Sequence, residues 1–353
     1  MDECKPILYD LNPSELQELL AGWNEPLYRS HQIWQGIYQN LWQTPQEFST
    51  LPASLKEKLS AYFCLEPLTQ VESLKSRDKK TTKLLFNLQD GRTIETVLMR
   101  YNERRTACIS TQAGCAMGCS FCATGQMGFH RHLSSGEIVA QVLYLSRLLF
   151  QEQDRLTNIV IMGMGEPFHN YNATIAAIGR LNDSKGFNFG ERRFTISTSG
   201  LIPGIQRFTA EKRQINLAVS LHAANDDLRN SLMPINRKYP LGPLMDACKE
   251  YVEKTGRRIT FEWALIHGVN DNLNDAQELI RLIRGLLCHV NIIPLNPTVN
   301  YKGKATTPER AQAFQKLLEY AGIPCTIRIR RGIDIQAGCG QLASLSNKQS
   351  LKQ

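Results

Sequence analysis

The strongest constraint on the fold of this chain is a regular alternation of strand-like and helix-like segments from about residue 106 onward. Short apolar segments are followed by longer amphipathic ones at intervals of roughly 35 residues, which favours a parallel sheet with right-handed crossovers. The predicted strands cover 106–111, 157–167, 193–200, 215–223, 258–268, 289–297 and 325–332, and the longer helices cover 134–150, 173–182, 240–254, 274–287 and 307–321. About six such units are too few for a closed eight-stranded barrel. The sequence therefore predicts an α/β fold with a partial (β/α)6 barrel, whose functional residues belong at the carboxyl ends of the strands.

Two further parts precede the barrel. Apolar residues recur at helical spacing within 14–42 and predict a small helical domain. Segments 83–88 and 93–99 flank the turn signal Gln-Asp-Gly-Arg and predict a β-hairpin. The predicted domains are a helical accessory domain at 1–65, a β-hairpin extension at 66–105, the barrel at 106–345 and a polar tail at 346–353.

The composition narrows the classes of partner. Lys and Arg exceed Asp and Glu by 41 − 33 = 8, which favours a polyanion such as nucleic acid. The apolar run 138–150 contains Gln and Arg and is too short to span a bilayer. The first residues lack a basic start followed by an apolar run, so we expect no secretory signal, no membrane partner and a cytoplasmic location. Ten cysteines in a chain of that location argue against a disulfide framework.

Three of the ten cysteines, Cys115, Cys119 and Cys122, fall within the segment GCAMGCSFCATG directly after a predicted strand. Three thiolates at this spacing can hold three irons of an iron–sulfur cluster and leave the fourth iron free. The alternative is a zinc site, for which His130 or His132 would supply the fourth ligand. Position after a barrel strand favours the cluster.

The segment CAMGCSFC resembles the cluster loop of radical S-adenosylmethionine (SAM) enzymes. Further segments resemble, in the same order, those of the RlmN/Cfr family of RNA methyltransferases: GFHRHLSSGEIVAQV, GMGEP, RFTISTSG, LAVSLHA, LMPINRKYPL, GVND, LNP and RGIDIQAGCGQL. The similarity covers roughly residues 85–345. It implies one 4Fe–4S cluster held by the three cysteines, with SAM on the open iron.

The resemblance also implies the reaction. The family methylates a ring carbon of adenine, and carbon 2 is too electron-poor to attack the SAM methyl group directly, so a radical route is needed. One SAM methylates a cysteine, and a second SAM supplies the radical that activates that methyl group. The expected substrates are an adenosine of 23S rRNA in the peptidyl-transferase region and the adenosine 3′ of the anticodon in tRNAs. The alternative is Cfr-like methylation of carbon 8 of the rRNA adenosine, but Pro167 is typical of the RlmN branch, where Cfr-type sequences tend to carry Ala.

Three residues match the family's catalytic positions. Cys339 matches the cysteine that carries the methyl group, and Gly338 and Gly340 beside it allow close backbone approach. Cys108 matches the cysteine that releases the product by forming a transient disulfide with Cys339, which a reducing cytosol permits. Glu95 matches the proton acceptor, and its apolar neighbours predict a raised pKa. Without the resemblance these residues would be interpreted as a buried cysteine, an inward strand residue and an edge-strand glutamate.

The predicted SAM contacts are small or polar residues at strand ends. They are Gly165, Glu166, Ser197, Ser220, Leu221, His222 and Asn296. A lone Gly-x-Gly is weak evidence for a cofactor site, but a glutamate beside it suits an ammonium group. Each residue alone is ordinary, and only their common position at strand ends favours a site.

Basic residues near predicted strand ends and barrel loops fit a phosphate backbone and a flipped-out base around one mouth of the barrel. They are Arg104, Arg105, Arg131, Arg192, Arg193, Arg237, Lys238, Arg328, Arg330 and Arg331. We also expect a flavodoxin- or ferredoxin-like one-electron reductant and a monomeric protein. A reading from another class is a zinc-dependent RNA-binding module without chemistry, against which the strand-end residues argue.

Overall fold

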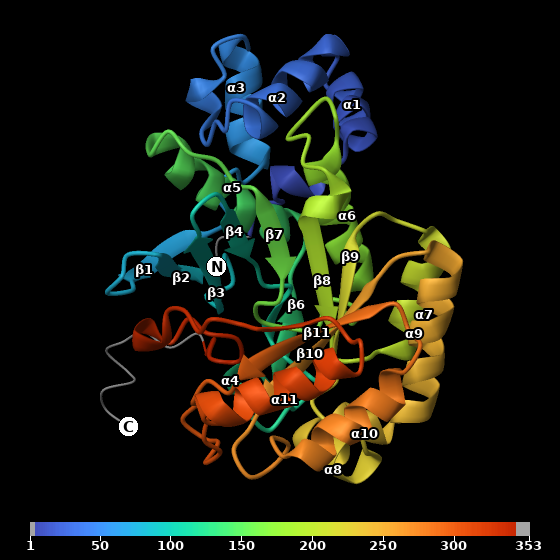
Figure 1. Cartoon of the computed structure of the whole chain (residues 1–353). Coiled ribbons are helices and arrows are strands. Elements are labelled where there is room, and N and C mark those ends of the chain that lie inside the picture. The colour runs from blue at the N-terminus through green and yellow to red at the C-terminus, as the bar shows by residue number, and fades with distance from the viewer. Residues whose placement is uncertain (1–3, 344–353) are drawn as a thin grey trace.

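The computed structural model describes residues 4–343, so the predicted tail at 346–353 lies outside the described residues. Seven parallel strands form the barrel part of one sheet in the order β4-β7-β8-β9-β10-β11-β12, and the connections between them contain six longer helices. The strands are β4 (Arg105–Cys108), β7 (Asn158–Ile161), β8 (Phe194–Thr198), β9 (Asn216–Ser220), β10 (Ile259–Leu265), β11 (Cys288–Pro294) and β12 (Cys325–Ile327). The helices are α5 (Ser135–Gln151), α6 (Tyr171–Asn182), α7 (Ile202–Glu211), α9 (Leu241–Thr255), α10 (Leu273–Ile283) and α11 (Pro308–Tyr320). The predicted α/β partial barrel is confirmed (Figure 1).

The predicted hairpin is also present, but it belongs to the same sheet as the barrel. β2 (Thr81–Asn87) and β3 (Thr93–Arg100) pair antiparallel, and β3 pairs antiparallel with β4. An additional edge strand, β1 (Thr69–Lys75), extends the sheet to ten strands. β1 carries mostly exposed polar residues, which is why no apolar alternation predicted it.

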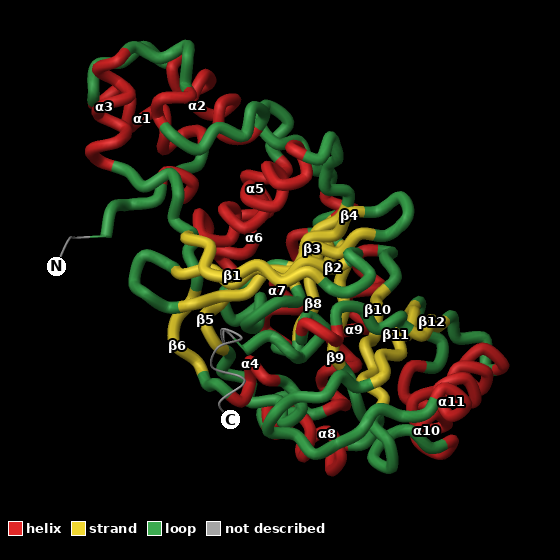
Figure 2. The backbone as a smooth tube through the Cα atoms, turned by 90° about the vertical axis from the view of Figure 1, so that its left-hand side faces the viewer, coloured by secondary structure: helices red, strands yellow, loops and turns green. Residues whose placement is uncertain are grey.

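Three helices form a group at one end of the molecule, apart from the sheet in both Figure 1 and Figure 2. They are α1 (Pro13–Gly22), α2 (Tyr28–Tyr38) and α3 (Ala53–Tyr62). A capping box at Asn12 and Glu15 starts α1. Asp10 joins the group to the barrel, because its Oδ1 accepts hydrogen bonds from Gly136 N (2.6 Å) and Ser135 Oγ (2.8 Å) at the start of α5.

A separate two-stranded ribbon holds the cysteine loop. β5 (Gln112–Gly114) and β6 (Phe129–His132) pair antiparallel on either side of it, and the short helix α4 (Ala123–Gln126) follows the last cysteine. Cys115 N donates a 2.8 Å hydrogen bond to Gly128 O across the base of the loop. The ribbon thus brings both ends of the cysteine loop together.

The segment after β12 runs back to the hairpin, as the red trace of Figure 1 shows. Asp334 accepts a hydrogen bond from Arg77 N (2.8 Å), and Ala343 N donates to Glu95 Oε2 (2.8 Å). This return segment (residues 328–343) closes the open side of the partial barrel between β12 and β3.

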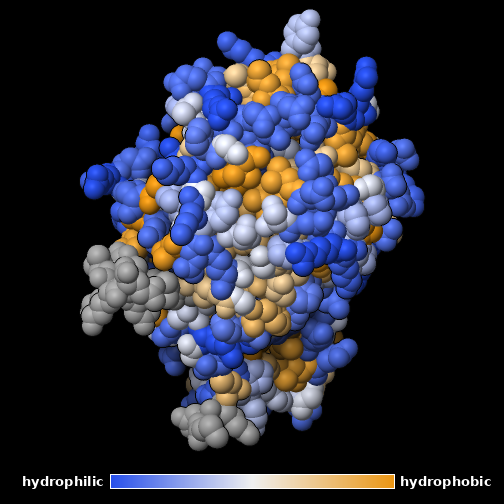
Figure 3. All heavy atoms as spheres, turned by 90° about the horizontal axis from the view of Figure 1, so that it is seen from below, coloured by the Kyte–Doolittle hydropathy of each residue, from blue (hydrophilic) through white to orange (hydrophobic). Residues whose placement is uncertain are grey.

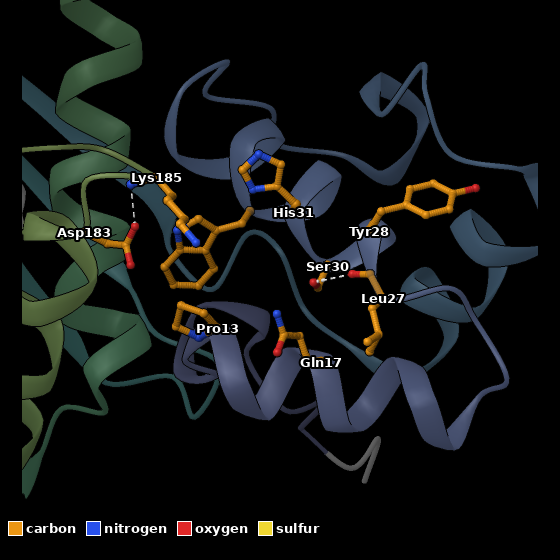
Figure 4. A pocket seen from close by; sticks show the side chains of 9 residues that line it. Pro13, Gln17, Leu27, Tyr28, Ser30, His31, Asp183 and Lys185 are labelled. Atoms are coloured by element: carbon orange, nitrogen blue, oxygen red, sulfur yellow. Dashed lines mark hydrogen bonds between the residues drawn. The ribbon is translucent and has the colours of Figure 1, made fainter.

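No helix in residues 4–343 is long and apolar enough to cross a membrane. The face seen from below in Figure 3 is largely hydrophilic, with its apolar residues in separate patches. Most buried apolar side chains form one large core, to which Phe261 and Trp263 of β10 contribute. A smaller cluster, Leu232, Met233, Ile266 and Leu295, packs against the cysteine loop.

Candidate active site

The three cysteines line one cavity of about 160 Å³ at the carboxyl ends of the strands. Ser120 N donates to Leu232 O (2.9 Å) and Ala123 N to Gly340 O (2.7 Å), so the loop is fastened to two distant parts of the chain. Burial raises the pKa of Cys119, and the nearby thiols of Cys122 and Cys115 raise it further. Three thiols on one cavity wall are the donor set that an iron–sulfur cluster requires.

The fourth ligand of a zinc site is not delivered by the predicted histidines. His130 is exposed, and His132 Nδ1 lies 3.0 Å from Gln112 Nε2; neither ring lines the cavity. Within residues 4–343 no three His, Cys, Asp or Glu side chains are grouped closely enough for a single metal ion. The thiols therefore fit a cluster with one side open to the cavity better than a closed tetrahedral site.

The loop after β7 brings Gly165 and Glu166 to the same cavity. Gly165 has φ +100°, and a Cβ there would lie 2.5 Å from Gln112 Cβ, so only glycine fits. The Glu166 carboxylate accepts hydrogen bonds from Ser199 N and Oγ (both 2.7 Å) and from Phe168 N (3.0 Å). Burial nevertheless raises its pKa. A cation in the cavity would favour the charged form of this carboxyl.

Four of the other predicted SAM contacts line the cavity, namely Ser197, Ser220, His222 and Asn296. Leu221 does not: its side chain is fully buried, and its carbonyl accepts from Arg229 Nε (3.1 Å). Leu221 and His222 follow the end of β9.

His222 adopts a left-handed backbone, with φ +61°. Its Nδ1 accepts a 2.9 Å hydrogen bond from Ala264 N, which leaves the ring proton on Nε2. Burial, and then the charge of Arg229, lowers the pKa of His222 to about 3. The imidazole is therefore neutral at physiological pH, and Phe121 of the cysteine loop packs edge-on against it at 4.9 Å between ring centroids.

Cys339 lies where two cavities meet. It lines the cysteine cavity and also a second cavity of about 100 Å³, which Cys108 lines as well. Asn296 Nδ2 donates to Cys339 O (3.1 Å), and Arg328 Nη1 lies 4.0 Å from Cys339 Sγ. Burial raises the pKa of Cys108 to about 12, so its thiol is protonated in this arrangement. The structure thus brings together the two cysteines that the family resemblance singled out.

Glu95 is placed differently from expectation. Its side chain is 1% exposed and lines neither cavity. Lys83 Nζ lies 2.8 Å from Glu95 Oε1, and Ala343 N donates to Oε2. A buried ion pair therefore replaces the apolar surroundings that the flanking residues predicted, because the adjacent strand β2 turns a lysine inward.

Two charged residues at the site were missed: Glu262 in the cavity wall and Arg229 behind it. Glu262 lines the cysteine cavity; its Oε2 accepts from Ser197 Oγ (2.6 Å), and its Oε1 accepts no hydrogen bond. Arg229 is fully buried and donates to the carbonyls of Ser199 (2.8 Å) and Ser220 (3.0 Å), which fixes two strand ends. A glutamate inside an apolar strand was a visible signal for Glu262; nothing in the sequence around Arg229 marked it.

The basic residues predicted at one mouth are divided between the two ends of the barrel. Arg104, Arg192 and Arg193 precede their strands and so lie at amino ends, whereas Arg237 and Lys238 follow β9. Arg105 pairs with Asp154, and Arg131 pairs with Asp90 and Glu137. These ion pairs are structural contacts within the chain, so a single basic mouth is not what the fold builds.

The model of the radical SAM superfamily matches residues 109–283. A crystal structure of a radical SAM methyltransferase from Sphaerobacter thermophilus superposes with a TM-score of 0.95, at 51% identity, over 96% of this chain and 100% of that one. Together with the cysteine loop at the strand ends, these findings define a radical SAM enzyme, which uses a 4Fe–4S cluster and SAM.

The particular family follows from the relatives. The model of the ribosomal RNA large subunit methyltransferase N-terminal domain matches residues 7–65. Dual-specificity RNA methyltransferase RlmN 1 of Myxococcus xanthus is 50% identical over 97% of this chain and 96% of its own length. The probable dual-specificity RNA methyltransferase RlmN of Geobacillus kaustophilus is 47% identical over 98% and 95%. The chain therefore belongs to the RlmN family and is a SAM-dependent RNA methyltransferase.

Proposed function

We propose that the enzyme methylates carbon 2 of an adenosine in the peptidyl-transferase region of 23S rRNA, and of the adenosine 3′ of the anticodon in tRNAs. The dual specificity named for the relatives supports two RNA substrates. Pro167 favours carbon 2 over the Cfr-like alternative, carbon 8. A cytoplasmic location, a monomeric state and a flavodoxin- or ferredoxin-like reductant complete the proposal.

The position of Cys339 carries this proposal. A cysteine that accepts a methyl group from SAM and passes it on must contact both the SAM site and the base, and Cys339 lines two cavities at once. When bound, the cluster and SAM supply the one-electron chemistry that activates a C–H bond. In this proposal seven residues hold SAM against the cluster that Cys115, Cys119 and Cys122 bind. They are Gly165, Glu166, Ser197, Ser220, Leu221, His222 and Asn296. Leu221 acts through its backbone.

Cys108 completes the release step. The Cys108 thiol loses its proton, and its sulfur attacks the Cys339 sulfur to form a disulfide. The bond between Cys339 and the transferred carbon breaks, its electron pair stays on that carbon, and the carbon takes up a proton to become the methyl group. The shared cavity supports this pairing. The role of Glu95 as proton acceptor is proposed from the resemblance alone. Its carboxylate pairs with Lys83 and accepts a hydrogen bond from Ala343 N, outside both cavities, so the geometry adds no support.

The domain division is also a proposal: helical domain 1–65, hairpin extension 66–105 and barrel 106–345. It is supported by the separate group of α1–α3 and the family-model boundaries, although β1–β3 continue the barrel sheet.

Mass spectrometry of nucleosides tests the function. The purified holoenzyme, with SAM and a chemical reductant, is incubated with a 23S rRNA fragment of the peptidyl-transferase region and, separately, with unmodified tRNA. We expect 2-methyladenosine from both. Formation of 8-methyladenosine would establish the alternative, and no product from tRNA would restrict the enzyme to rRNA.

A further inference from the structure

The inward faces of the barrel strands are unusually polar in their amino-terminal halves. Asn158, Thr195, Asn216, Thr260, His289 and Thr326 line a cavity of about 720 Å³ inside the barrel. In closed (β/α) barrels such positions are filled by branched apolar side chains. A cavity of this size falls within the ~300–1,000 Å³ usual for ligand sites. The lumen is therefore built to hold something polar.

The charge of this lumen selects an anion. Arg104, Arg257, Arg258 and Arg328 line it, and no Asp or Glu does. Arg257 is oriented by hydrogen bonds to Gln214 Oε1 and Asn216 Oδ1 (both 2.9 Å). Thr106, which is 4% exposed, also lines the cavity, and its Oγ1 has no hydrogen-bond partner. Fixed guanidinium groups beside an unused hydroxyl suit a phosphate and a sugar.

The lumen leads to the reacting sulfur. Tyr101, Met162 and Arg328 line both the lumen and the cavity shared by Cys108 and Cys339, and Met162 also lines the cysteine cavity. Arg328 Nη1 lies 4.0 Å from Cys339 Sγ. A ligand entering from the amino ends of the strands therefore reaches Cys339 through the cavity that it shares with Cys108 and Cys122.

We propose that the RNA enters here: the target adenosine passes through the lumen toward Cys339, and its ribose-phosphate stays at the amino-terminal mouth against Arg257 and Arg258. This inference rests on the proposed function. The lumen is large, polar and cationic, and it shares lining residues with the cavity between Cys108 and Cys339. The carboxyl-end cavity is left to SAM.

Arg258→Gln tests the phosphate contact, because Arg258 is exposed and its loss leaves no buried group unpaired. We expect the KM for the 23S rRNA fragment to rise about tenfold. The slope of log RNA affinity against log salt concentration should become shallower by about one, the loss of one phosphate contact. The kcat at saturating RNA changes far less. Arg281→Gln is the matched control, since Arg281 is exposed on α10 outside the barrel.

Thr260→Phe tests the route itself by narrowing the lumen. We expect at least a hundredfold loss in kcat/KM for RNA, while SAM still methylates Cys339, as intact-mass measurement of the protein would show. Retained methylation of Cys339 separates a blocked route from a misfolded chain, and Arg258→Gln keeps the proposal testable if Thr260→Phe fails to fold.

The outcomes separate the two proposals. A wild-type holoenzyme that produces no methyladenosine contradicts the proposed function. A wild type that methylates RNA, with Arg258→Gln indistinguishable from Arg281→Gln in KM and salt dependence, overturns the lumen route and leaves the function standing.

Discussion

Cys339 owes its position to contacts from far along the chain. Asn296 holds its carbonyl, Arg328 lies beside its sulfur, and Ala123 N binds the carbonyl of the following Gly340. Each contact is modest, but together they place one thiol at the junction of two cavities. In the proposed reaction, the sulfur faces SAM in one cavity and the base in the other.

Replacing the two cysteines separates two stages of the reaction. We expect Cys339→Ala to abolish methyl transfer and to retain reductive cleavage of SAM, because the three cluster ligands and the cavity wall remain. We expect Cys108→Ala to accumulate a covalent protein–RNA adduct, which denaturing gel electrophoresis would reveal. Loss of SAM cleavage in Cys339→Ala, with its cluster intact, would contradict the assigned role.

His222 makes the stability of the fold depend on pH. Its pKa is lowered from 6.5 to about 3 by burial and Arg229, so below pH 6.5 the unfolded chain binds a proton that the folded chain excludes. The contribution of the neutral His222 ring to the free energy of unfolding is fully present above pH 6.5 and is lost as the pH falls toward 3.

His222→Asn removes this titration. An asparagine tolerates φ +61° and offers an oxygen to Ala264 N. Between pH 6.5 and 5 the wild-type free energy of unfolding should fall faster than that of the variant, by up to ~1.4 kcal/mol per pH unit. Urea unfolding across that range measures the difference, and parallel curves would exclude a buried neutral His222.

At the scale of elements, the loop after β7 connects the ribbon of β5 and β6 to the cavity. Gln112 of β5 braces it, because Gln112 Oε1 accepts from Glu166 N (2.8 Å) while Nε2 faces His132 and His169. The loop therefore links the ribbon that carries the cysteines to the strand ends that line the cavity.

Gly165→Ala should disrupt this link. The added Cβ would lie 2.5 Å from Gln112 Cβ, and the alanine would have to keep φ +100°. We therefore expect SAM affinity to fall at least tenfold, which is ~1.4 kcal/mol or more of binding free energy, and the Tm to fall as well. Isothermal titration with SAM and thermal unfolding check both. Gly179→Ala is the control: nothing lies within 4 Å of its added Cβ, and alanine favours the helix α6. Equal SAM affinity in the two variants would refute the argument.

At the scale of the whole molecule, the joint at Asp10 connects the helical group to the barrel. The Asp10 side chain accepts hydrogen bonds from Ser135 and Gly136 at the start of α5, and Arg180 of α6 donates to the carbonyls of Asp10 and Leu11. Both barrel helices therefore contact the same short segment, which fixes where α1–α3 lie.

Asp10→Ala removes the two hydrogen bonds to the start of α5 and leaves the Ser134 cap in place. We expect a loss of about 1–2 kcal/mol in the free energy of unfolding and faster release of residues 1–65 by limited proteolysis. Asp246→Ala on α9 is the control, because Asp246 makes only an exposed pair with Lys249. Identical proteolysis of the two variants would show that the joint does not depend on this side chain.

Periodicity and local signals predicted the barrel strands, the hairpin of β2 and β3, and the helix α5 with its capping box at Ser134 and Glu137. They missed β1, whose residues are mostly exposed, and α8 (Asp226–Leu232), which is short and mostly polar. Such elements depend on pairing or on a cap at Asn225 rather than on an apolar stripe.

The sequence by itself determined the order of strands and helices, the cysteine loop and the family, because these depend on neighbours along the chain. Only the tertiary structure decided that Cys108 and Cys339 share a cavity, that Glu95 pairs with Lys83, and that the lumen is polar and open toward Cys339. Those facts depend on which strand faces meet inside the barrel and on the path of the segment after β12. Contacts between residues far apart in the chain produce no periodic pattern in the sequence, so the sequence alone does not predict them.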